Sequence, residues 1–305
     1  MKRNRLGSSE LYVGEIGLGC MSLGTEKQKA IALVHEALER GVNFLDTADL
    51  YEDGLNEEIV GEAIRSSGCN RDDIIISTKV GNRRIPGQEG WVWDPSKAYI
   101  LSSVKGSLKR LGVEYIDLYQ LHGGTLEDPI DETIEAFEQL KQEGVIREYG
   151  ISSIRPNVIR EYASRSGIVS VMSQYSLLDR RPEETVLPLL EDKGIGLIAR
   201  GPVAKGILSA NGRIRTEKGY LDYSSEELAA LHDELAQLAK DGRSLSQLAI
   251  RYSLSHPAAA VTIPGASSRE QLLHNIEAGE AEPLTPDELK HLHRLTKGNV
   301  YEQHR

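Results

Sequence analysis

Short apolar runs alternate with longer amphipathic stretches along the whole chain. The apolar runs are rich in Ile, Val, Leu or Tyr, and polar residues, Gly or Pro follow each of them closely, which is typical of strands buried on both faces. They cover residues 15–20, 43–46, 74–79, 115–122, 145–152, 169–174, 195–200 and 259–263. Eight such strands, each followed by a helix, predict an α/β fold of the (β/α)8 TIM-barrel type, and an open doubly wound sheet is the alternative.

The amphipathic stretches have recognisable helix ends. Residues 25–28 form a capping-box sequence that predicts a helix closed by Gly41. Asp94 and Pro95 supply an N-cap and a first helical residue for a helix that ends at Gly112. Further helices are predicted over 131–143, 155–165 and 226–240, and a last one begins with the cap 285–288.

Three further features concern the organisation of the chain. Residues 6–13 look extended and predict a hairpin that closes the floor of the barrel. The segment 209–224 is polar and irregular, and a loop of this length is more often functional than idle. We find no repeat, low-complexity segment or interdomain linker, so we expect one domain over residues 1–305 with its sites at the C-terminal face of the strands.

Composition excludes several classes of function. A net charge of −10 disfavours a sequence-independent grip on nucleic acid phosphates. The two cysteines, Cys20 and Cys69, lack CxxC spacing, so neither a disulfide framework nor a thiolate zinc site is expected. The N-terminus does not resemble a signal peptide, and no apolar stretch reaches transmembrane length. We expect a cytoplasmic monomer or weak homo-oligomer with no nucleic-acid, membrane or metal partner.

Four polar residues fall at the C-terminal ends of neighbouring predicted strands, where barrels of this kind build active sites. Asp46 ends the second strand, Tyr51 lies in the loop after it, Lys79 ends the third and His122 the fourth. A tyrosine hydroxyl has a pKa of about 10, too high for an efficient general acid near neutral pH. A nearby Lys79 cation would lower that pKa, and Asp46 would compensate its buried charge. His122 would orient the substrate, so the four residues predict a proton-donating unit.

Each of the four residues also has an ordinary structural explanation. An isolated aspartate after a strand is usually a cap, Tyr51 could pack on the barrel rim, and Lys79 could extend from the strand end to water. His122 taken alone would be a satisfied strand-end histidine. These explanations require four coincidences at one rim, whereas a shared catalytic role requires one.

Residues 41–51, Gly-Val-Asn-Phe-Leu-Asp-Thr-Ala-Asp-Leu-Tyr, with Asn-Glu-Glu-Ile-Val-Gly-Glu-Ala-Ile at 56–64, resemble the signature of the aldo-keto reductases. The catalytic Asp, Tyr, Lys and His of that family match the four residues above in order and spacing. The resemblance runs from about residue 6 to 275 and is closest to the bacterial type related to potassium-channel β subunits. It implies a barrel that binds NADPH in an extended form without a Rossmann domain, and reduction of small aldehydes or ketones with Tyr51 as the general acid.

The resemblance also implies a cofactor site around the same rim. Its expected residues are Gly19, Cys20, Met21, Asp46, Ser152, Gln174, Arg200, Gly201, Pro202, Val203, Lys205, Gly206, Arg213, Pro264, Gly265, Ser267, Arg269, Gln271 and Asn275. The last of these follow a strand and a glycine turn at a helix N-terminus, an arrangement that suits an anion. Ser267 and Arg269 match the contacts to the 2′-phosphate, which favours NADPH over NADH.

Three positions depart from the family pattern. Ser153 stands where the family commonly has Asn, and His274 replaces a frequent acidic residue. Arg200 replaces the Tyr or Trp that usually stacks on the nicotinamide, although a planar guanidinium can also stack on a ring. Its repulsion from an oxidised nicotinamide would favour binding of the reduced cofactor.

Two other functions remain as alternatives. A cofactor-binding regulatory subunit resembling the channel β subunits would share the fold and the four residues. A metal-dependent hydrolase or isomerase would need clustered His and acidic ligands at strand ends, where only Asp46 and His122 qualify. Trp91 and Trp93 either line a substrate pocket or pack locally, and the loops identify no substrate beyond small aldehydes and ketones.

Overall fold

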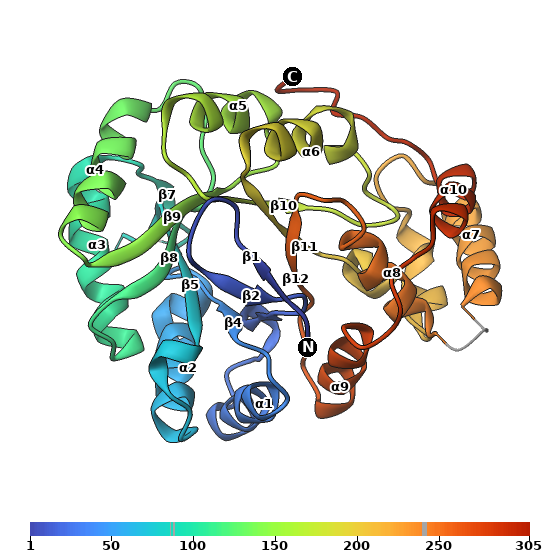
Figure 1. Cartoon of the computed structure of the whole chain (residues 1–305), viewed down its shortest axis with the longest axis horizontal. Helices are drawn as coiled ribbons and strands as arrows, with labels where there is room; N and C mark the ends of the chain where they lie inside the picture. The colour runs from blue at the N-terminus through green and yellow to red at the C-terminus, as the bar shows by residue number, and fades with distance from the viewer. Residues whose placement is uncertain (86, 88, 240–242) are drawn as a thin grey trace.

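The predicted apolar runs form eight parallel strands at the centre of the structure, and helices surround them (Figure 1). The computed structural model describes residues 1–85, 87, 89–239 and 243–305. The strands follow one another around the sheet in chain order: β3 (Leu18–Gly19), β4 (Phe44–Asp46), β5 (Ile75–Val80), β8 (Ile116–Leu121), β9 (Ile146–Ser152), β10 (Ser170–Gln174), β11 (Gly196–Arg200) and β12 (Ala259–Ile263). Bridges from Ile16 to Thr262 and from Gly19 to Gly265 join the first strand to the last. The barrel is therefore confirmed, and the doubly wound sheet is wrong.

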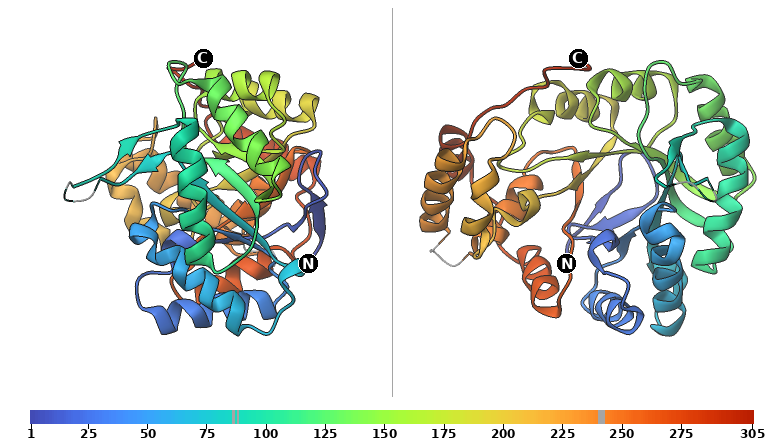
Figure 2. Two further views of the ribbon diagram at one scale, coloured as in Figure 1. Left: turned by 90° about the vertical axis from the view of Figure 1, so that its left-hand side faces the viewer. Right: turned by 180° about the vertical axis from the view of Figure 1, so that it is seen from behind.

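Helices cover the outside of the barrel, as the views of Figure 2 show. They are α1 (Lys27–Glu39), α2 (Leu55–Ser66), α3 (Lys97–Leu111), α4 (Ile130–Gln142), α5 (Pro156–Arg165), α6 (Pro182–Lys193), α7 (Ser225–Leu238), α8 (Leu245–Ser253), α9 (Arg269–Ala278) and α10 (Pro286–Leu295). The capping box at Thr285 is present, and Gly112 ends α3 with a φ of 66°. Residue 240, the predicted end of α7, lies outside the described residues.

Two predicted helix starts are wrong. The capping box at residues 25–28 does not form, because α1 begins at Lys27 after Glu26, which makes no side-chain cap bond. Helix α3 begins at Lys97, and its N-cap is Ser96 rather than Asp94. The Asp94 carboxylate instead accepts hydrogen bonds from the amide and hydroxyl of Ser96, so it orders the turn that precedes the helix.

The predicted N-terminal hairpin is present and lies across one end of the barrel (Figure 1). Its antiparallel strands, β1 (Arg3–Arg5) and β2 (Tyr12–Gly14), flank the turn. Leu6, Leu11 and Val13 pack in one buried cluster with strand residues from the barrel interior. Gly7 fits only without a side chain, because a Cβ there would lie 2.1 Å from the carbonyl oxygen of Val169. The hairpin thus closes the floor and leaves the opposite rim for the site.

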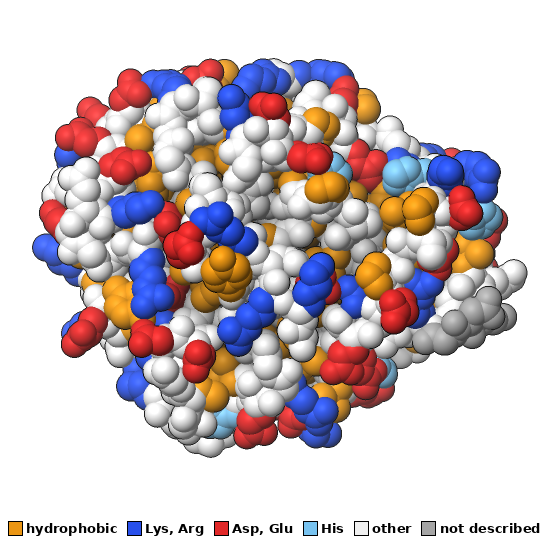
Figure 3. Space-filling view, in the orientation of Figure 1, with side chains coloured by type: hydrophobic (Ala, Val, Ile, Leu, Met, Phe, Trp, Pro, Cys, Tyr) orange, Lys and Arg blue, Asp and Glu red, His pale blue; other side chains and the backbone are white. Residues whose placement is uncertain are grey.

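The remaining surface features are modest. A small hairpin of β6 (Asn82–Arg83) and β7 (Val92–Trp93) follows β5, and the loop 209–224 contains a short helical turn, Gly212–Lys218. In the described part of the chain, no helix is long and apolar enough to cross a membrane. Figure 3 shows Lys and Arg side chains interspersed with Asp and Glu side chains on the face of the hairpin, rather than gathered into one field.

Candidate active site

The pleat of the strands explains why the predicted site residues meet. Side chains along a strand point alternately to its two faces. Residues of one parity pack in the interior cluster, whereas those of the other parity pack against the helices. The inward series run from Phe44 to Asp46 in β4, from Ile75 through Ser77 to Lys79 in β5, and from Leu118 through Gln120 to His122 in and just after β8. Apolar residues therefore fill the floor, and polar ones fill the rim.

Lys79 is the centre of this polar group and is fully buried. Its Nζ donates to Asp46 Oδ2 at 2.7 Å and to the carbonyl oxygen of Thr47 at 2.7 Å. The same atom lies 3.4 Å from the hydroxyl oxygen of Tyr51. Ser77 donates its hydroxyl to the other oxygen of Asp46 at 2.9 Å, so both carboxylate oxygens are satisfied. The structure thus brings Asp46, Lys79 and Tyr51 into one hydrogen-bonded group.

Electrostatics assigns a protonation state to each member. Burial alone would lower the pKa of Lys79, but the Asp46 carboxylate and the Tyr51 oxygen raise it above its usual value, so Lys79 stays charged. Burial raises the pKa of Tyr51, and the Lys79 cation acts in the opposite direction. The net effect is a raised pKa, whereas the sequence predicted that Lys79 would lower the pKa of Tyr51. Tyr51 is therefore a protonated hydroxyl near neutral pH, beside a cation that stabilises its phenolate.

His122 lies across from the tyrosine. Its ring meets the edge of Tyr51 with centroids 5.9 Å apart. Burial, together with the charges of Lys79 and Arg200, lowers the pKa of His122 to about 3. Its Nδ1 is buried and makes no hydrogen bond to any described residue. His122 is thus a neutral imidazole near neutral pH.

The loop that carries Tyr51 is held in a strained conformation. Glu52 and Asp53 have φ values of 48° and 55°, and Gly54 follows with 89°. A Cβ on Gly54 would lie 2.6 Å from Cδ of Arg110, which itself pairs with the buried Glu57 at 2.6 Å. Strain of this kind persists only where the surroundings enforce it, and it clusters at active sites. Sequence analysis did not single out this support, although the Asp-Gly pair after Tyr51 is a turn signal.

Asp49, two positions before Tyr51, is a second residue of this loop that was not among the predicted site residues. Its Oδ2 accepts the hydroxyl of Ser103 at 3.2 Å, while its Oδ1 is buried without a partner among the described residues. Burial and the nearby Glu57 raise the pKa of Asp49 to about 7. The signal that would have found it is a second acid within the short segment between Asp46 and Tyr51.

Gly19, Cys20 and Met21, which the resemblance assigns to the cofactor site, lie where the first and last strands meet. Gly19 and Gly265 pack backbone to backbone, and a Cβ on Gly265 would lie 2.4 Å from the hydroxyl oxygen of Ser22. Cys20 is buried, and its carbonyl oxygen accepts from Asn56, whereas Met21 is exposed. The two glycines therefore allow the first and last strands to pack closely where the barrel closes.

On the strands next to β12, Gln174 and Arg200 are paired across β10 and β11. Arg200 donates to the amide oxygen of Gln174 at 3.0 Å, and the amide nitrogen of Gln174 donates to the hydroxyl of Tyr220. Ser152 ends β9, next to Ser153, whose amide donates to the carbonyl oxygen of Met172 at 3.0 Å. Tyr220, which belongs to the loop 209–224, was not among the predicted residues.

The turn after β11 has its own unusual backbone. Gly201, Lys205 and Gly206 have positive φ values of 68°, 57° and 84°. Pro202 is buried, and Val203 directly precedes the short helical turn Ala204–Gly206. Arg213 pairs through its Nε with Asp233 of α7 at 3.1 Å.

The residues of the predicted phosphate site lie in the turn before α9 and on α9 itself. Asn275 donates to the carbonyl oxygen of Gly265 at 3.1 Å, directly after Pro264, and Gln271 accepts from the hydroxyl of Ser267 at 3.0 Å. The Arg269 side chain is largely exposed, and its guanidinium pairs with Glu36 of α1.

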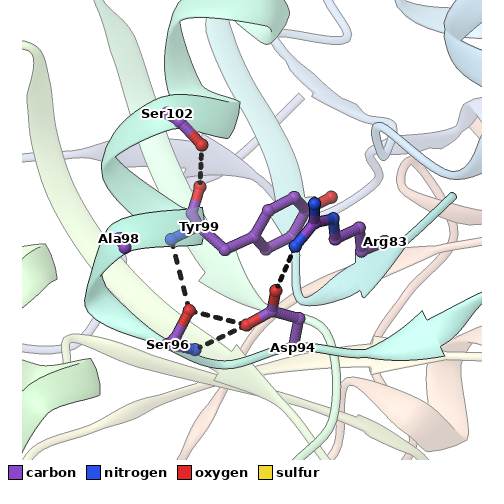
Figure 4. Close-up of a pocket in the computed structure, with 6 residues that line it drawn as sticks. All are labelled: Arg83, Asp94, Ser96, Ala98, Tyr99 and Ser102. Carbon is purple, nitrogen blue, oxygen red and sulfur yellow. Dashed lines mark hydrogen bonds and ion pairs between the residues drawn. The ribbon is translucent and has the colours of Figure 1, made fainter. Parts of the chain in front are cut away.

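A separate pocket of about 280 Å³ lies beside the rim, between the small hairpin and α3 (Figure 4). Its polar groups are paired with each other, with Arg83 at 3.1 Å from Asp94, and it contains none of the predicted site residues. Trp93 does not line it and instead packs locally, donating to Asp128 at 3.0 Å. Among the described residues, no group of three His, Cys, Asp or Glu is placed to hold a metal ion.

Sequence comparison relates the chain to known oxidoreductases. The model of the aldo/keto reductase family matches residues 15–297. The uncharacterized oxidoreductase YqkF of Bacillus subtilis is 57% identical over the full length of both chains, and the probable aldo-keto reductase 1 of Glycine max is 31% identical, over 90% of this chain and 83% of its own length.

Solved structures agree as well. The holo form of the aldo-keto reductase AKR11C1 from Bacillus halodurans has a TM-score of 0.93 and 56% identity, covering 100% of this chain and 99% of its own. Its apo form has a TM-score of 0.87 with 53% identity over the same shares. The glycerol dehydrogenase AKR11B4 from Gluconobacter oxydans has a TM-score of 0.86 and 25% identity over 99% and 98% of the two chains. The barrel, the buried group around Lys79 and these likenesses agree: the chain belongs to the aldo/keto reductase family.

Proposed function

We propose that this oxidoreductase transfers a hydride from NADPH to the carbonyl carbon of small aldehydes and ketones, with Tyr51 as the general acid. The observation that carries the proposal is the distance of 3.4 Å between the Tyr51 hydroxyl and the buried, charged Lys79. A proton donor beside a fixed cation suits a reaction in which negative charge develops on an oxygen.

In this proposal each residue has a separate role. Tyr51 holds its proton until charge develops on the carbonyl oxygen, because burial raises its pKa. Lys79 then stabilises the phenolate, and Asp46 holds Lys79 in place at 2.7 Å. The neutral His122 offers its ring N–H to the substrate oxygen and orients it without adding a charge.

The rim residues fit a dinucleotide that supplies the hydride. Gln174 and Ser152 end the neighbouring strands β10 and β9, and their polar side chains suit the carboxamide of a nicotinamide. The start of α9 with Arg269 suits the phosphate on the adenosine ribose, which supports NADPH over NADH. The likeness to a holo form with a TM-score of 0.93 supports a rim shaped for a cofactor. The cytoplasmic location and the monomeric or weakly oligomeric state remain predictions.

The test is NADPH oxidation with an activated aromatic aldehyde, comparing wild type with Tyr51→Phe. We expect kcat to fall by roughly 10²- to 10⁴-fold, the range that a general acid contributes, with NADPH binding retained. Tyr99→Phe on α3 is the matched control, since that hydroxyl does not belong to the group of Asp46, Tyr51, Lys79 and His122, and it should retain the wild-type rate.

Two results would contradict the proposal in different ways. A wild type that binds NADPH but reduces no carbonyl compound in a broad panel would favour a regulatory subunit that senses the cofactor. A Tyr51→Phe variant with an unchanged rate would leave the enzyme class intact and refute Tyr51 as the acid.

A further inference from the structure

The predicted phosphate ligand, Arg269, is already engaged by a carboxylate of another helix. Its Nε and Nη2 each lie 3.1 Å from an oxygen of Glu36, so the two planar groups form a bidentate pair. Glu36 belongs to α1, which packs beside α9 next to the junction of the first and last strands (Figure 1). The same carboxylate accepts from Arg40 at 3.0 Å.

This pair occupies the part of Arg269 that a phosphate would use. Arginine recognises carboxylate and phosphate with the same fork of N–H groups, so the two anions compete for it. A phosphate that binds Arg269 either displaces Glu36 or remains close to its negative charge. Both outcomes reduce the affinity for a ligand with a 2′-phosphate. The affinity for a ligand without this phosphate is unchanged, because such a ligand does not compete for Arg269.

We propose that Glu36 is a specificity-determining residue that weakens the preference for NADPH over NADH by competing with the 2′-phosphate for Arg269. The proposal rests on the proposed function, because it concerns the adenosine end of the same cofactor site. NADH carries a neutral ribose hydroxyl at this position, which does not compete with the Glu36 carboxylate for the Arg269 guanidinium.

The experiment measures dissociation constants of NADPH and NADH for the full chain by fluorescence titration at fixed ionic strength. We expect Glu36→Gln to raise the NADH-to-NADPH ratio of dissociation constants by roughly two- to fivefold, the size that one exposed ion pair supports. The change should lie in the NADPH value. Glu39→Gln, which removes an exposed carboxylate from the same helix without touching Arg269, should leave the ratio unchanged.

A second pair of variants tests the competition itself. In an Arg269→Gln background, Glu36→Gln should change the ratio by less than about twofold, because the guanidinium for which the anions compete is absent. An unchanged or lowered ratio in Glu36→Gln, or a full effect in the absence of Arg269, would overturn the inference. If wild type binds neither NADPH nor NADH, the proposed function fails instead, so the two failures are distinguishable.

Discussion

The buried acid behind the catalytic loop gives a quantitative prediction about stability. Asp49 has a pKa of about 7 in the folded chain against a usual value of 3.8, mainly because of burial and then because of Glu57. Between these two pH values the unfolded chain releases the proton of Asp49 while the folded chain keeps it. The folded state therefore loses stability as pH rises from about 4 to 7, and the loss is complete above pH 7.

The size of this loss follows from the shift. Each pH unit between the two pKa values corresponds to about 1.4 kcal/mol, so a rise from pH 5 to pH 8 should cost the wild type roughly 2–3 kcal/mol through Asp49. Asp49→Asn cannot ionise and should not show this loss. The hydrogen bonding of its carboxamide does not depend on pH, so the change in relative stability between the two pH values is the diagnostic quantity.

The assay is urea unfolding of wild type, Asp49→Asn and Asp192→Asn at pH 5 and pH 8. Asp192 is exposed on α6, so its variant should follow the wild type at both pH values. The stability of Asp49→Asn relative to wild type should increase by roughly 2–3 kcal/mol at the higher pH. A relative stability that is the same at pH 5 and pH 8, or a carbon NMR titration of Asp49 near pH 3.8, would refute the reasoning.

Three further predictions concern the site. His122 has a pKa of about 3, so its ring NMR signals should not titrate between pH 5 and pH 8, and a midpoint in that range would contradict its neutral role. Gly54→Ala should destabilise the chain by about 1–3 kcal/mol and lower kcat, because the added Cβ meets Arg110 in a left-handed turn. Gly24→Ala is its control, with a similar φ of 76° but open space, and equal thermal shifts for the two would refute the steric argument. Arg200→Tyr should raise the affinity for NADP⁺ relative to NADPH by removing a positive charge from the proposed nicotinamide site, and an unchanged ratio would rule this out.

The features that depend on the pattern of apolar and polar residues within one segment were predictable from the sequence. The apolar runs gave strand positions to within a few residues because strands buried on both faces leave a continuous apolar signal. The alternation of side chains then places Asp46 and Lys79 on the inner face, where the structure has them hydrogen-bonded at 2.7 Å. Helix starts were less predictable because neighbouring polar residues compete for the cap, as Ser96 does with Asp94.

The features that depend on distant residues were not predictable. The Gly54 turn needs Arg110 from α3 to hold it, and the pKa of Asp49 depends on burial by segments that are remote in sequence. The direction of the pKa shift of Tyr51 was not predictable for the same reason. The Lys79 charge was expected from spacing along the strands, whereas the opposing burial is a property of the whole rim.

The partners of the expected cofactor residues explain why contacts alone do not determine cofactor choice. Arg269 is paired with Glu36, Arg213 with Asp233, and Arg200 with Gln174. Cofactor binding at such a rim exchanges one set of hydrogen bonds for another, so the affinity is a small difference between two larger quantities. A residue that never touches the cofactor can then change the affinity as much as one that does. Family signatures record the residues that contact the ligand, and for this reason the sequence pattern identified Arg269 but not Glu36.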